Sequence, residues 1–160
     1  MADCKYETYT IHTTSNTDSE SNVNYTCFLT MPLKDVVEAS VVTASIETQS
    51  NVVHMVVEEL DTKFGDYATV ASNPFNGSSL RNTFGTFYRE TVSVTPDPQF
   101  KNPRLVFLNR YDMSHQYLYP IKRLDRLNIR LYNEQGSDLT NPISPTFITF
   151  KFKCLRTNLC

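Results

Sequence analysis

The chain has few glycines, no long apolar run and almost no net charge, and each shortage excludes a class of function. Its 160 residues include four glycines and no Gly-rich fingerprint, which leaves little material for a phosphate cradle. No apolar run approaches the ~20 residues of a membrane-spanning helix, and the N-terminus lacks the apolar core of a secretory signal. We therefore expect no transmembrane segment and synthesis in the cytosol. The net charge of -2 gives no global attraction to nucleic acid.

Metal-binding residue types are present, but not in the spacings that metal sites need. The cysteines are widely spaced and form no C-x-x-C pair, so we expect free thiols at Cys4, Cys27, Cys154 and Cys160. A bridge between the terminal segments remains an alternative that would need an oxidising compartment or a catalysed step. No metal spacing links the three histidines, which are His12, His54 and His115. The sequence therefore predicts no metal and no cofactor.

The densest group of carboxylates offers the one place to look for acid-base catalysis. It comprises Glu58, Glu59, Asp61 and Asp66. If the two glutamates lie on one strand, adjacent side chains point to opposite faces and cannot act on one substrate. We expect a solvated strand end here, and no enzyme.

Alternation of apolar and polar residues predicts an all-β protein. Strands are expected over residues 6–12, 26–33, 40–47, 52–60, 87–95, 104–109, 127–132 and 146–153. A bend over 34–39 is expected to separate the second strand from the third. The strand 52–60 is apolar on both faces, which favours a central place in a sheet, although a short buried helix remains an alternative. Turn chemistry at Asn133 and Gly136 predicts the end of the strand before them.

About 8 strands with almost no helix indicate one antiparallel domain, either a two-sheet β-sandwich or a barrel. We expect this domain to span residues 1–160. A long loop at 61–85 holds three of the four glycines, and a short tail is expected at 154–160.

A basic stripe and a tyrosine-rich segment are the candidate contact residues. On a strand, Arg126 and Arg130 project to the same side as Asn128, with Arg123 just before them. This stripe is either a solvated face or a docking surface for an acidic neighbour, to which Arg offers bidentate hydrogen bonds. Nucleic acid is not expected, since no aromatic residues interleave the stripe. A loop up to Pro120 carries the tyrosines Tyr111, Tyr117 and Tyr119.

Six segments of the chain are similar to a known group of proteins. They are YTIH (9–12), FLTMPLKDVV (28–37), ASVVTASIE (39–47), VVHMVVEEL (52–60), LDRLNIRLYNEQG (124–136) and FITF (147–150). Their order resembles that in small minor structural proteins of the nucleocytoplasmic large DNA viruses. The resemblance implies a β-sandwich, expected to be a single jelly roll, that serves as a minor capsid or penton component without catalysis.

From this resemblance we expect a virion protein that assembles in the host cytoplasm. Its partners would be other capsid proteins, with a homopentamer as one arrangement, and its contact residues would be the stripe and the three tyrosines. The alternative is a receptor- or glycan-binding β-sandwich module on a virion surface, with the 61–85 loop and the exposed tyrosines forming the site.

Overall fold

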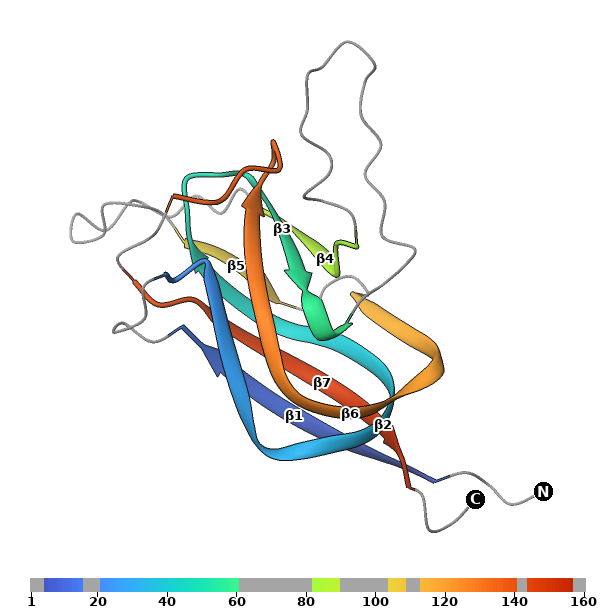
Figure 1. The fold of residues 1–160 in the computed structure, drawn as a ribbon. Coiled ribbons are helices and arrows are strands. Elements are labelled where there is room, and N and C mark those ends of the chain that lie inside the picture. The colour runs from blue at the N-terminus through green and yellow to red at the C-terminus, as the bar shows by residue number, and fades with distance from the viewer. Residues whose placement is uncertain are drawn as a thin grey trace.

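The structure is a computed structural model that describes residues 5–15, 21–60, 82–89, 104–108, 113–140 and 144–156 (Figure 1). The strands are β1 (Tyr6–Thr14), β2 (Asn24–Glu47), β3 (Val52–Val57), β4 (Gly85–Tyr88), β5 (Arg104–Leu108), β6 (Ser114–Asn133) and β7 (Phe147–Leu155). A 3-10 turn, η1 (Glu58–Leu60), follows β3. The expected all-β class is confirmed, with seven strands in the described part of the chain.

All seven strands pair antiparallel in one curled sheet. Its order is β1-β7-β2-β6-β3-β4, and β5 pairs with β2 beside this path. β2 pairs with β6 from Asn24 to Ser40 and with β5 from Thr43 to Glu47, and β7 pairs with the opposite side of β2 from Val36 to Ser45. The long strands β2 and β6 curve as they cross the molecule, so that the sheet folds over on itself (Figure 1). This arrangement is consistent with the expected antiparallel sandwich.

The hydrophobic core lies inside the curl, where one part of the sheet packs against the other (Figure 1). Alternate residues of β7 point inward, including Phe150 and Phe152, which are fully buried. Aromatic rings join strands that are distant along the sheet: Phe87 of β4 lies 5.3 Å from Phe107 of β5, centroid to centroid. Contacts of this kind close the sheet over its apolar side, where each large buried side chain contributes about 1.5–3 kcal/mol.

The prediction of separate strands over 26–33 and 40–47 is wrong. β2 runs without interruption from Asn24 to Glu47, because the expected bend is absorbed inside the strand. At Asp35 the backbone takes φ 49°, and pairing with β6 continues on both sides of it, at Lys34 and at Val36.

Several other strand boundaries differ from the sequence prediction. β3 ends at Val57, and residues 58–60 form η1 in place of the rest of the strand. β6 already begins at Ser114, inside the segment expected to be a loop. β7 extends to Leu155, two residues into the expected tail. Most of the 61–85 loop and most of the strand expected at 87–95 lie outside the described residues.

The turn predicted after residue 132 is confirmed. Gly136 takes φ 76°, a left-handed conformation that glycine adopts without strain. The side-chain oxygen of Asn133 accepts hydrogen bonds from the backbone N–H groups of Gln135 and Ser137, at 2.9 and 3.0 Å. This side chain thus holds the turn, after which Asp138 forms an antiparallel bridge with Tyr132.

Two bulges interrupt the pairing of β2 with β6. Between the pairs Phe28–Arg126 and Leu33–Leu124, residues 29–32 of β2 face Asp125 alone. Between the pairs Val36–Ile121 and Glu38–Gln116, residues 117–120 of β6 face a single residue of β2. We call these segments the β2 bulge and the β6 bulge. They are equal in length and lie on opposite strands, so the second restores the register that the first shifts.

Candidate interaction surface

Carboxylates of the same chain engage the predicted basic stripe. Arg126 Nε lies 3.2 Å from Glu59 Oε1, and Arg130 Nη2 lies 3.3 Å from Glu58 Oε1. Arg123 lies 3.5 Å from Asp125 in a more exposed pair. The structure therefore brings Arg126 and Arg130 together on one surface but leaves little unbalanced positive charge there.

Both glutamates reach β6 because the chain leaves β3 before them. The expectation that Glu58 and Glu59 point to opposite faces assumed a strand, whereas η1 turns both side chains toward the stripe. Glu59 also accepts the backbone N–H of Asn128 at 2.7 Å, and Glu58 accepts the Asn128 side-chain amide at 2.8 Å. The two carboxylates therefore hold η1 against β6.

Glu59 replaces a missing strand partner. Pairing of β3 with β6 ends at Val57–Ile129, so the next ladder position on β6 is Asn128. A strand would offer a backbone carbonyl to this N–H group; here the carboxylate of Glu59 does so. Its side chain is only 18% exposed, so the hydrogen bond is partly shielded from water.

The tyrosines of the predicted contact set have different environments. Tyr119 is 83% exposed, whereas Tyr117 packs against the core and donates a 3.5 Å hydrogen bond to the carbonyl of Leu60. Tyr111 lies outside the described residues. Of the predicted tyrosines that the structure describes, only Tyr119 is placed to touch a partner.

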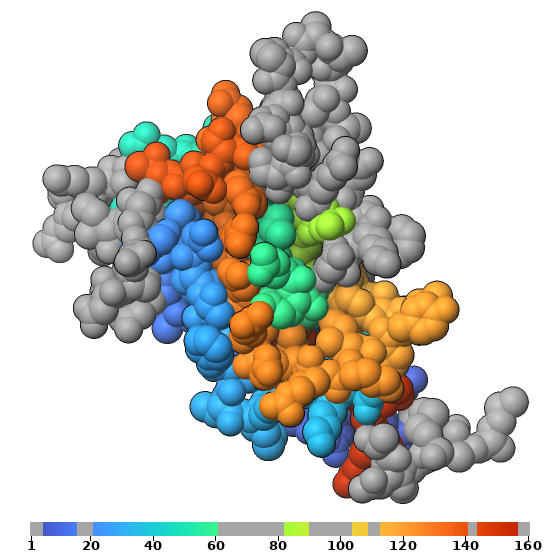
Figure 2. Space-filling model, viewed as in Figure 1, coloured from blue at the N-terminus to red at the C-terminus, as the bar shows by residue number. Residues whose placement is uncertain are grey.

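The β6 bulge presents an apolar tip, formed by the expected contact residue Tyr119 and by Leu118, which the sequence did not single out. Leu118 is 88% exposed beside Tyr119, at the part of β6 where neither residue pairs with β2. In Figure 2 the first half of β6, in light orange, projects at the right of the molecule. A signal was present in the sequence, because three large apolar residues in a row before Pro120 break the alternation of the strand.

The β2 bulge exposes large side chains too. Met31 lies in this bulge and Phe28 just before it, and both are mostly exposed. Each bulge thus places large apolar side chains in water at the point where a long strand bends, although pairing holds the chain on both sides of the bulge.

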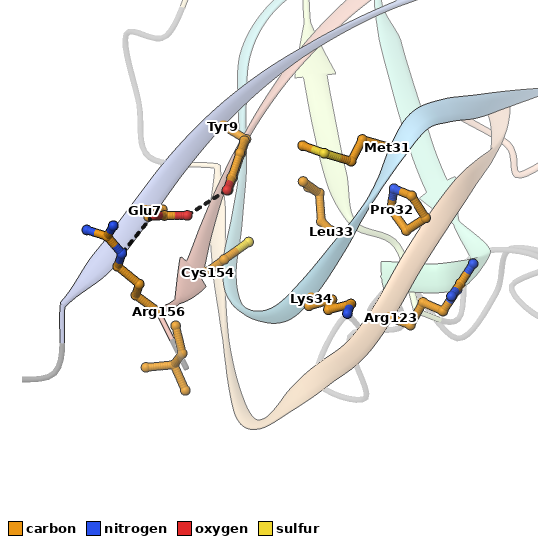
Figure 3. A pocket seen from close by; sticks show the side chains of 10 residues that line it. Glu7, Tyr9, Met31, Pro32, Leu33, Lys34, Arg123, Cys154 and Arg156 are labelled. Atoms are coloured by element: carbon orange, nitrogen blue, oxygen red, sulfur yellow. Dashed lines mark hydrogen bonds and ion pairs between the residues drawn. The ribbon is translucent and has the colours of Figure 1, made fainter. Parts of the chain in front are cut away.

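A cleft of about 670 Å³ lies beside the β2 bulge (Figure 3). On one wall, the Tyr9 hydroxyl donates a hydrogen bond to Glu7 Oε2 at 2.6 Å. Glu7 Oε1 also forms an ion pair with Arg156 Nε at 3.1 Å. Lys34 and Arg123 lie on the other side of the cleft. The charged groups near Tyr9 are therefore already engaged with one another.

Cys154 also lines this cleft, but as a thiol of low reactivity. Burial, with a smaller effect of the Glu7 and Asp35 carboxylates, raises the pKa of Cys154 to about 11. The group is therefore protonated near neutral pH and a poor nucleophile. Burial also raises the pKa of Cys27. Both thiols are free, as expected; Cys4 and Cys160 lie outside the described residues.

In the described ranges, no group of three His, Cys, Asp or Glu residues could hold a metal ion. No helix in that part of the chain is long and apolar enough to cross a membrane. The sequence matches no protein-family model, and no curated protein is significantly similar to it.

Proposed function

We propose that this chain is a structural component of an icosahedral DNA-virus capsid, a minor or vertex protein that acts through protein-protein contacts. The observation that carries the proposal is the β6 bulge, where Leu118 and Tyr119 stand in water on a paired strand. The resemblance of six sequence segments to minor structural proteins of large DNA viruses supports the same role. We further propose that the connections of the curled sheet follow a single jelly roll.

An apolar tip that is exposed to water is energetically costly, and a partner that covers it removes this cost. Large apolar side chains gain most when they are transferred from water into a partner surface, and aromatic anchors are enriched among residues that dominate binding energy. Pairing between β6 and β2 restrains the chain before and after the bulge. The bulge therefore loses little conformational entropy when it docks. The partner surface would be an apolar pocket on another capsid protein.

The basic stripe plays a smaller part in this proposal than the sequence suggested. Since Glu58 and Glu59 already engage Arg130 and Arg126, an acidic partner would have to displace them. We assign the stripe to holding η1 on β6.

The proposal is tested by adding charge to the bulge. In Leu118→Asp/Tyr119→Asp, stability should change little, within about 0.5 kcal/mol for each exposed site, because neither side chain is packed. Incorporation into particles, measured by quantitative mass spectrometry of gradient-purified virions, should fall at least about tenfold.

The matched control is Gln135→Asp/Ser137→Asp, which adds the same charge at exposed positions of the 133–136 turn region. This control should enter particles like the wild type. If the bulge variant were incorporated as fully as the wild type, the β6 bulge would not be a contact surface in the particle.

A further inference from the structure

The first strand forms an edge of the sheet. β1 pairs with β7 over all nine of its residues, and no other described strand pairs with it. In Figure 1 β7 lies between β1 and the second half of β2. One side of β1 is therefore left without a ladder in the described part of the chain.

The hydrogen bonds at both ends of β1 show which residues face this edge. The backbone carbonyl of Lys5 accepts a hydrogen bond from the N–H of Arg156, and the N–H of Ser15 donates one to the carbonyl of Thr146. In an antiparallel ladder such bonded pairs occur at every second residue, so the odd-numbered residues of β1 bond β7. The even-numbered residues direct their N–H and C=O groups outward: Tyr6, Thr8, Thr10, His12 and Thr14.

β1 lacks the features that usually protect an edge strand. Natural edges are blunted by lysine, proline, bulges or short length. The strand Tyr6–Thr14 contains no lysine, proline or glycine, and its register with β7 is unbroken. Its one charged residue besides histidine, Glu7, points inward to Tyr9 and Arg156. The edge is therefore long, regular and uncharged.

The other edges of the described sheet differ in this respect. β4 and β5 have only four and five residues. The first half of β2 is open on the side away from β6, but the β2 bulge interrupts it after Phe28. β1 is thus the edge best suited to accept another strand.

We propose that β1 pairs antiparallel with β1 of a second copy of this chain, around a two-fold axis at Thr10. In this register Thr10 faces Thr10 of the second copy, Thr8 faces His12, and Tyr6 faces Thr14. All outward-directed backbone groups of β1 then find partners, and only Thr14 already uses its carbonyl, for a 3.6 Å contact with the Cys27 thiol. No like charges meet, since Glu7 faces Thr13 of the second copy.

This pairing is favourable for physical reasons. Threonines opposite each other are among the stabilising cross-strand pairs, and β-branched residues suit a pleated surface. Because β1 is already extended on β7, a second copy orders no new segment. The inference does not rest on the capsid proposal, because it concerns the isolated chain.

The test uses opposite charges at the symmetric position. Thr10→Glu and Thr10→Lys each bring like charges together across the two-fold axis, whereas an equimolar mixture brings opposite charges together. Thr10→Glu should fold normally, because Lys151 lies beside it on β7. The mass in solution is measured by multi-angle light scattering over a concentration series, and folding by circular dichroism.

We expect a dimer of the wild type, a dissociation constant raised at least about tenfold in each single variant, and recovery of the dimer in the mixture. Lys151→Glu is the control, since it changes the charge of the same sheet face one strand inward, and it should remain dimeric. A wild type that stays monomeric up to millimolar concentration would overturn the inference. So would a dimer that tolerates Thr10→Glu, or a mixture that fails to recover it.

Discussion

At the scale of single residues, the carboxylate of Glu59 performs a task that backbone groups usually perform in a sheet. It completes the ladder of β6 at Asn128, where β3 has already turned away into η1. A partly buried N–H group without an acceptor is costly, so this one contact matters more than the exposed ion pairs around it.

Glu59→Ala should therefore lower the free energy of unfolding by about 1–3 kcal/mol, because the Asn128 N–H loses its acceptor. Urea denaturation followed by circular dichroism measures the change. Glu58→Ala is the matched control: its side chain is 55% exposed and accepts no backbone N–H in the hydrogen bonds found, so about 0.5 kcal/mol or less is expected. Equal losses in both variants would refute the role of Glu59 as ladder partner.

His54 is the residue from which we expect a pH effect on stability. It lies buried in β3, with its Nδ1 2.9 Å from the Thr86 hydroxyl. Burial lowers the pKa of His54 below its ordinary value of 6.5, because the charged form is poorly solvated. The unfolded chain then binds a proton at a pH where the folded chain does not.

The contribution of His54 to the free energy of unfolding is therefore fully present above about pH 6.5. It decreases as the pH falls from there toward the lowered pKa of the folded state. In His54→Gln, the free energy of unfolding should consequently fall less between pH 7 and pH 5 than in the wild type. If His54→Gln kept the wild-type slope, this histidine would not be the source of the pH dependence.

At the scale of elements, the main feature is the pair of compensating bulges in β2 and β6. Their opposite register shifts let two long strands bend together while their ends stay in one register. Sequence reasoning placed the β2 bulge inside the strand expected at 26–33, and the β6 bulge inside an expected loop. The reason is physical: a bulge and a loop share turn residues such as Pro32 and Pro120, and only the partner strand decides between them.

Asp35 tests whether the bend of β2 depends on backbone conformation. Its φ of 49° is costly for a branched side chain and free for glycine. Asp35→Val should destabilise the fold by about 1–2 kcal/mol, whereas Asp35→Gly should be close to neutral. Lys122→Ala separates the contribution of the exposed Lys122–Asp35 ion pair at 2.8 Å, which we expect to be small. Equal effects of Val and Gly in thermal unfolding would contradict this account.

At the scale of the whole molecule, periodicity identified the all-β class and the buried faces. The alternation in the strand expected at 146–153 agrees with the structure, in which Phe150 and Phe152 of β7 are buried. Strand order and the engagement of Arg126 by Glu59 could not be predicted, because both depend on contacts between segments distant in sequence. The exposure of Leu118, by contrast, had a sequence signal, the run of three large apolar residues before Pro120.

The two proposed surfaces have different consequences for assembly. The β1 edge would join two copies around a two-fold axis, and the β6 bulge would dock on a different protein. A two-fold pair fits a position between or on the two-fold axes of an icosahedral shell better than a five-fold vertex. If the proposed β1 dimer forms, it favours the minor capsid role over the vertex role within the capsid proposal.

The central claim is that this chain is built into an icosahedral particle. The most direct measurement is the amount of the chain relative to the major capsid protein in gradient-purified particles, by quantitative mass spectrometry. The account predicts a constant ratio across the particle peak, at a copy number compatible with icosahedral symmetry, and its loss in Leu118→Asp/Tyr119→Asp. A chain found only in the soluble fraction, with no fixed ratio to any particle, would contradict it.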